Sequence, residues 1–299
     1  MVDRSPRLRY INEVSKPDCC SLFVEAPSRP ERAHVGNRFG RTVFALLLIA
    51  TGLGVGVRPL LPEEHKAHET VQLVQLVIGM LVTFAALVLG LMTASAKSSF
   101  DTASNDLRTY AAELIEFDTT LRELGSAADG SRRLLRQYTA AAIASTWPRE
   151  PAPSGDYPRD LGSPDNSQQL ENVRLGDMLT TVGRQLRQLR TQDALQQRAL
   201  DDALIQYRRV IDARWKIIEE AHSSISQPFF WTLTFWLGVI FLSFGLIAPR
   251  NALALVTITL GAVSIASAVY VIVDLDTPFT GPIVISSLPL RDTLEHLSR

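Results

Sequence analysis

Four stretches of the chain are almost free of charge, and they are long enough, or nearly so, to cross a membrane. They lie at residues 42–57, 71–97, 228–247 and 252–273, and a long, charged, Arg-rich segment separates the second from the third. A helix needs about 20 apolar residues to cross a hydrocarbon core of roughly 30 Å. The pattern therefore predicts an all-α integral membrane protein with four transmembrane helices.

One side of the second span differs from the rest of that span. Small or polar residues recur there at steps of three or four, which places them on one helix face opposite Leu, Val, Ile and Met. This small-residue face comprises Gln72, Gln75, Gly79, Thr83, Ala86, Gly90, Thr93 and, at its end, Lys97. Such a face either packs on another helix or borders a water-filled path, and the sequence leaves both alternatives open. Around an axis of several copies it would line a pore, with Lys97 as a ring of cations that favours anions.

The segment after the second span is polar but keeps a helical period. Phe100, Leu107, Leu114 and Leu121 recur every seven residues, and Ala103, Tyr110, Phe117 and Leu124 lie between them. This a/d spacing predicts that the membrane helix continues into water and packs there as a coiled coil. Further helical periods follow, with a break at residues 125–130, a proline-rich loop at 148–164 and another break near Thr191.

These patterns divide the chain into segments. We expect a disordered polar leader at 1–40, a transmembrane hairpin at 41–97, a cytoplasmic helical domain at 98–226, a second hairpin at 227–276 and a C-terminal tail at 277–299. Leucines in the tail predict a short amphipathic segment. In the first span, Gly52, Gly54 and Gly56 permit close helix packing.

Charge and cysteine content limit the expected partners and the cellular location of the protein. The 30 Lys and Arg residues nearly balance the 31 Asp and Glu residues, so we expect no nucleic-acid partner. Basic residues near the spans concentrate on the side that carries both termini and the helical domain, which the positive-inside rule places in the cytoplasm at the inner (plasma) membrane. The first forty residues hold no apolar stretch, so we expect no signal peptide. Cys19 and Cys20 are adjacent and predict no structural disulfide.

Residues with catalytic or metal-binding chemistry are sparse. The sequence holds no phosphate-binding glycine loop, zinc spacing or nucleophile motif, so we expect neither an enzyme nor a cofactor. His65 and His68, with neighbouring glutamates, could hold a metal or sense pH, but a solvated loop between two spans needs no such purpose. We therefore predict no metal site.

Asp274 and Asp276 lie at the end of the fourth span and form a second candidate functional site. Carboxylates at a helix C-terminus face the negative end of the helix dipole and need cationic partners. Lys97 ends the second span on the same side of the membrane. We therefore expect Lys97 to pair with Asp274 or Asp276, or to share an ion site with them.

Several segments resemble the bacterial bestrophin-like family of membrane proteins. They are LPEEH at 61–65, ALVLGLMTASAKSSFD at 86–101, RRLLRQYT at 132–139, FWLGVIFLSFGLIAPRN at 235–251, DLDTPFTG at 274–281 and ISS at 285–287. The resemblance runs from about residue 44 into the tail. It implies a distant similarity to bestrophins, which are oligomeric anion channels whose second span lines the pore and whose last span is followed by an acidic calcium-binding clasp.

The resemblance thus implies a homo-oligomeric channel for small inorganic ions in a lipid bilayer. The alternative is a non-conducting membrane scaffold or sensor that acts through its cytoplasmic helices.

Overall fold

The computed structural model describes residues 29–60, 68–159, 172–190, 193–222, 227–249, 251–279 and 281–299. All regular structure in these ranges is helical, as predicted. The helices are α1 (Arg29–Val57), α2 (His68–Glu123), α3 (Asp129–Thr146), α4 (Val173–Gln188), α5 (Ala194–His222), α6 (Gln227–Ile247), α7 (Ala252–Leu275) and α8 (Leu288–Ser298). The cysteine pair, His65 and its neighbours at 61–67, and Thr191 lie outside the described residues.

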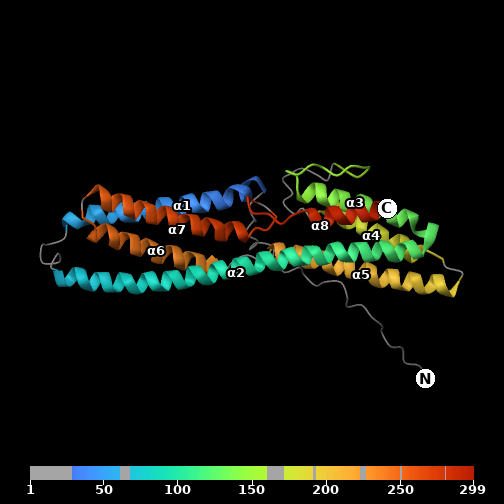
Figure 1. Ribbon diagram of the computed structural model, residues 1–299, viewed down its shortest axis with the longest axis horizontal. Coiled ribbons are helices and arrows are strands. Elements are labelled where there is room, and N and C mark those ends of the chain that lie inside the picture. Colours follow the sequence, from blue (N-terminus) through green and yellow to red (C-terminus); the bar gives the residue numbers. More distant parts are fainter. Residues whose placement is uncertain are drawn as a thin grey trace, which may run out of the picture.

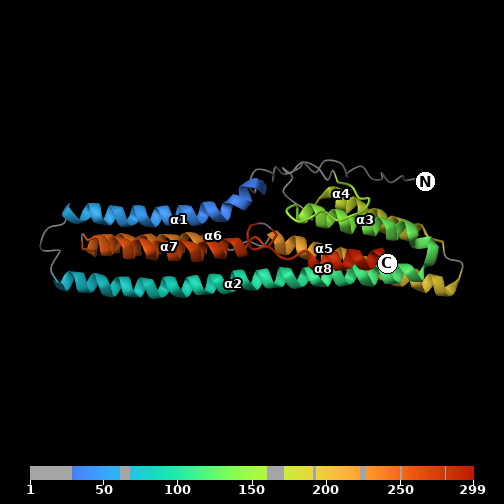
Figure 2. The ribbon, with the colours of Figure 1, turned by 45° about the horizontal axis from the view of Figure 1, so that its top comes forward.

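The helices form an elongated molecule with two halves (Figure 1). Helices α1, α6, α7 and the first part of α2 make the membrane half, and each is long and apolar enough to cross a bilayer. The rest of α2, with α3, α4, α5 and α8, makes the extramembrane half (Figure 2). As the heptad pattern predicts, α2 runs through both halves as one helix of 56 residues.

In the membrane half, α6 and α7 separate α1 from α2 (Figure 2). The tightest crossing joins α1 to α6, because a Cβ atom added at Gly54 would lie 2.2 Å from the carbonyl oxygen of Leu242. A Cβ added at Gly245 would likewise lie 2.2 Å from the carbonyl oxygen of Thr51. The predicted role of glycine in close packing is therefore confirmed at Gly54, whereas Gly52 has open space around it.

Helix α1 begins at Arg29, well before the predicted boundary at residue 41. The residues 29–40, expected to be disordered, are helical where the structure describes them. Tertiary contacts account for the difference. The Phe39 ring lies 5.2 Å from the Phe230 ring, edge to face, and Gly40 is buried against Tyr270.

In the extramembrane half, the predicted heptad residues form the core. The side chains of Leu107, Tyr110, Leu114, Phe117 and Leu121 are all fully buried, and α5 packs along this stripe. Helix α3 closes the core from another side, and its Tyr138 hydroxyl hydrogen-bonds the hydroxyl of Tyr110.

A buried carboxylate also ties α3 to α2. Asp118 accepts hydrogen bonds from Nε of Arg122, at 2.7 Å, and from Nε of Arg132, at 2.9 Å. The hydrogen bond to Asp118 raises the pKa of the Arg132 guanidinium. Only 2% of the surface of Asp118 is exposed, so these two arginines supply the partners that a buried carboxylate needs.

Candidate functional site

Within the membrane half, α2 has three distinct faces. One is buried against α6 and α7 and consists of Ile78, Ala85, Met92 and Ala96. At 3.6 residues per turn, the small-residue face lies about a third of a turn from it. A third face carries exposed large apolar side chains: Leu73, Leu76, Met80, Phe84, Leu87 and Leu91.

The whole small-residue face is exposed in the single chain. Its members are Gln72, Gln75, Gly79, Thr83, Ala86, Gly90, Thr93 and Lys97. A Cβ atom added at Gly79 or at Gly90 would meet nothing within 4 Å. Within the described part of the chain, this face therefore does not pack on another helix of the same chain.

The hydroxyl groups on this face donate to their own helix. Thr83 donates to the carbonyl of Gly79 at 2.9 Å, and Thr93 donates to the carbonyl of Leu89 at 2.7 Å. These bonds satisfy the hydroxyl protons inside an apolar medium, and they leave oxygen lone pairs directed away from the helix. These two threonines make the face mildly polar while their hydroxyl groups bond within their own helix.

Lys97, at the end of the face, forms an ion pair with Asp101, one turn further along α2. The ammonium also lies 5.7 Å from the centre of the Phe100 ring. Among the described residues, no ion pair joins Lys97 to Asp274 or Asp276, so the structure does not bring the predicted partners together. The reason is local, because Asp101 lies four residues from Lys97 on the same helix face.

Asp274 instead anchors the connection between α7 and α8. Only 3% of its surface is exposed, and its carboxylate accepts a hydrogen bond from the backbone N–H of Ile283 at 2.9 Å. Gly281 has φ +105°, and a Cβ atom there would lie 2.3 Å from Oδ1 of Asp274. The loop therefore folds closely around this carboxylate. No group of three or more His, Cys, Asp or Glu within the described ranges is arranged to hold a metal ion.

Polar contacts between α2 and α5 continue below the span. Lys216 Nζ donates to Asp106 at 2.7 Å, and Gln206 Nε2 donates to Glu113 at 2.6 Å. The hydrogen bond with Asp106, which is buried, raises the pKa of Lys216. Sequence reasoning missed these pairs because they depend on the register of two antiparallel helices far apart in the chain.

The C-terminal helix α8 is built into the extramembrane half rather than loosely attached to it. Trp147 Nε1 donates to the carbonyl of Ile285 at 2.7 Å, and Thr293 donates to the carbonyl of Ala111 at 3.1 Å. Arg291 forms an ion pair with Glu150 at 3.1 Å. The predicted amphipathic segment of the tail is confirmed, and its burial connects α7 to the α2–α3 core.

The comparisons with known proteins agree with this architecture. The family described as the bestrophin-like domain matches residues 44–290. The chain belongs to the bestrophin-like family. The match includes α1 from residue 44 onward and the other three membrane helices, and with them the small-residue face and the Asp274 loop.

Solved structures with the same fold include a bacterial bestrophin homologue from Klebsiella pneumoniae. A crystal structure of a mutant of that homologue superposes with a TM-score of 0.57 at 16% identity, covering 87% of this bestrophin-like chain and 99% of the other. The structure solved by Zn-SAD phasing gives 0.54 at 16% identity, covering 84% and 96%. A mutant described only as a membrane protein gives 0.56 at 15% identity, covering 86% and 97%. No curated protein matches the chain.

Proposed function

We propose that this bestrophin-like protein is a homo-oligomeric channel for small inorganic ions, with a preference for anions, in which the small-residue face of α2 borders the pore. The observation that carries the proposal is the exposure of that whole face in the single chain. The second alternative from the sequence, a water-filled path, needs a face that is exposed in this way.

The position of α2 supports an oligomer. Helix α2 flanks α6 and α7 on the side away from α1, so its remaining faces point outward from the four-helix bundle (Figure 2). One helix face cannot enclose a path, but copies arranged around an axis can. The exposed apolar face beside it, which includes Leu76, Met80 and Leu87, would then be covered by lipid or by a neighbouring copy.

The composition of the face suits conduction. From Gln72 to Thr93 it carries no Leu, Ile, Val or Phe, so it offers no apolar ring of the kind that closes pores by dewetting. The only charged residue on the face is Lys97, at the end that leads into the extramembrane half. We place that half and both termini in the cytoplasm and the spans in the plasma membrane, where the protein acts as a channel rather than as an enzyme.

Purified protein in planar lipid bilayers tests the proposal. We expect single-channel currents in a KCl gradient, and we expect Gln75→Leu and Thr83→Leu to lower the conductance severalfold by adding apolar bulk to the pore wall. Ser95→Leu is the matched control, since Ser95 is exposed on another side of α2. The channel proposal would be contradicted if the purified protein gave no current, or if all three variants changed the conductance equally.

One observation favours the alternative, a non-conducting scaffold or sensor. Large apolar side chains are exposed on α5 in the extramembrane half, namely Leu195, Ile205 and Trp215. A partner protein would cover such side chains. Mass measurement in detergent separates the two functions, because a monomeric protein cannot enclose a pore and would leave only the scaffold.

A further inference from the structure

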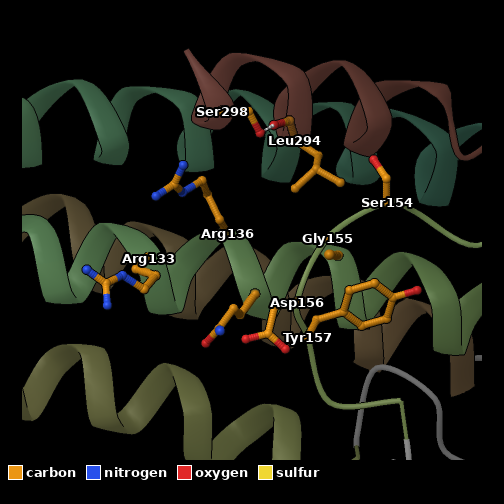
Figure 3. Close-up of a pocket in the computed structure, with 10 residues that line it drawn as sticks. Arg133, Arg136, Ser154, Gly155, Asp156, Tyr157, Leu294 and Ser298 are labelled. Carbon is orange, nitrogen blue, oxygen red and sulfur yellow. Dashed lines mark hydrogen bonds between the residues drawn. The ribbon is translucent and has the colours of Figure 1, made fainter.

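A cavity of about 260 Å³ opens on the extramembrane half, far along the chain from the small-residue face. Three elements line it: α3, the loop at 154–157 and the C-terminal end of α8 (Figure 3). Its polar lining includes Arg133, Arg136 and Gln137 from α3, and Ser154 and Asp156 from the loop. Leu294 of α8 and the ring of Tyr157 supply apolar wall.

The two arginines of this cavity differ from the other arginine of the same turn. Arg132 donates to the buried Asp118 and is part of the core. Arg133 and Arg136 are three residues apart on α3, and in the part of the chain that the structure describes neither forms a hydrogen bond or an ion pair. Both arginines therefore line one cavity with their donors unused among the described residues, and in Figure 3 their guanidinium groups extend from α3 on the side away from Gly155 and Tyr157.

Asp156 lines the same cavity without neutralising these cations. No ion pair joins it to Arg133 or Arg136 among the described residues, so its carboxylate lies more than 4 Å from their nitrogens. Gly155, which precedes it, has φ +123°, a conformation that favours glycine and turns the loop here. The cavity thus holds two cations and one anion that do not compensate each other directly.

The donors at this cavity match the chemistry of a phosphate group. Guanidinium groups bind phosphate oxygens through paired, charge-assisted hydrogen bonds, and the Gln137 amide and the Ser154 hydroxyl add neutral donors. Leu294 and Tyr157 add apolar lining for the rest of such a ligand. At about 260 Å³ the cavity is near the lower end of ligand pockets, which suits a compact ligand.

We propose that this cavity binds a phosphate-bearing small molecule, with Arg133 and Arg136 holding the phosphate and Leu294 contacting the rest of the ligand. Asp156 disfavours a free dianion, so it tunes the site toward a ligand that carries a donor group as well. A bound ligand would join α3 to the end of α8, and α8 is already fastened to the neighbouring loop by Arg291 and Glu150. The proposal is independent of whether the protein conducts ions.

Titration of the full-length protein in detergent tests the site, with gluconate in place of chloride to avoid competition. The probes are inorganic phosphate and adenosine monophosphate, followed by calorimetry and by the unfolding temperature. Because a charge-assisted hydrogen bond contributes about 1.5–3 kcal/mol, Arg133→Gln and Arg136→Gln should each weaken binding about tenfold or more. Asp156→Asn should strengthen phosphate binding, since it removes a like charge from the cavity wall.

Arg198→Gln on α5 is the matched control, because Arg198 is exposed and does not line the cavity. It should leave the affinity of both probes unchanged. Binding of both probes supports a site for the phosphate group itself, and binding of adenosine monophosphate alone supports a role for the apolar wall. No binding of either probe overturns the proposal, and so does binding that Arg133→Gln, Arg136→Gln and Arg198→Gln affect equally. Arg136→Lys keeps the charge and should retain part of the affinity if the site is intact.

Discussion

The two halves of α2 belong to one continuous helix but expose different kinds of surface, large apolar side chains in the membrane half and polar ones in the extramembrane half. In the membrane half, the buried positions include small residues such as Ala85 and Ala96, while Leu87 and Leu91 are exposed. In the extramembrane half, Leu107, Leu114 and Phe117 are fully buried, and polar residues cover the outside. The exposed surface of the helix therefore changes from apolar to polar within a few turns.

This difference indicates that different interactions stabilise helix packing in the two halves. In water, burial of large apolar side chains drives association at about 25 cal/mol per Å². In lipid this driving force is absent, and helices associate through close contact of small residues such as Gly54 and Gly245. Substitutions should therefore affect the two halves by different mechanisms.

The largest effect should come from the extramembrane core. Leu114→Ala removes a fully buried side chain and leaves a cavity, so it should lower the free energy of unfolding by about 2–5 kcal/mol. Leu260→Ala on α7 is the matched control, because 64% of Leu260 is exposed on the membrane half. Unfolding in detergent followed by circular dichroism measures both. Equal losses would show that the exposed apolar surface of α7 is packed rather than bathed by lipid.

The next largest effect should come from the crossing of α1 and α6. Gly54→Leu would force its side chain against the backbone of Leu242, so the helices must separate, at a cost of about 3 kcal/mol. Gly52→Leu, half a turn away, meets open space and should cost far less. The unfolding temperature in detergent compares the two variants. A larger loss for Gly52→Leu would mean that the small-residue contact does not hold this half together.

Much of this contrast could be read from the sequence, because periodicity records which side of a helix is buried. The seven-residue spacing of Leu107, Leu114 and Leu121 predicted both the continuity of α2 and its buried face. The small-residue face was visible in the same way, although the pattern did not say whether it packs. That this face is exposed could be recognised only once the positions of α6 and α7 against α2 were known.

What the sequence did not reveal depends on tertiary contacts. The early start of α1 at Arg29 is in a polar stretch, and Phe39 packs on Phe230 nearly two hundred residues later. The Lys97–Asp101 pair did have a local signal, since opposite charges four residues apart on a helix attract each other. The Asp274 anchor needed the fold of the following loop, which spacing alone does not specify.

A smaller effect is expected at the connection between the two halves. Gly281→Ala would place a side chain at φ +105° and 2.3 Å from Asp274, so it should cost about 2 kcal/mol through strain and displacement of the carboxylate. Gly125→Ala also has positive φ, at +63°, but meets no atom within 4 Å, so its cost should be about 1 kcal/mol. Thermal unfolding ranks the two. The reverse order would indicate that the Asp274 loop is not closely packed.

The smallest effect on stability should come from the Lys97–Asp101 ion pair, which lies where the membrane half of α2 meets its extramembrane half. Lys97 and Asp101 are about half exposed, with side-chain exposures of 58% and 54%, so breaking their pair should cost only about 0.3–0.5 kcal/mol. Substitutions of the same two residues should have a clear effect on ion selectivity, and the two effects should have opposite signs.

Lys97→Gln leaves the carboxylate alone at the end of the small-residue face and should shift the reversal potential in a KCl gradient toward cations. Asp101→Asn leaves the ammonium alone and should shift it toward anions. If both variants shifted the reversal potential in the same direction, the pair would lie outside the ion path. Inside the path, loss of a cation and loss of an anion must change the selectivity in opposite directions.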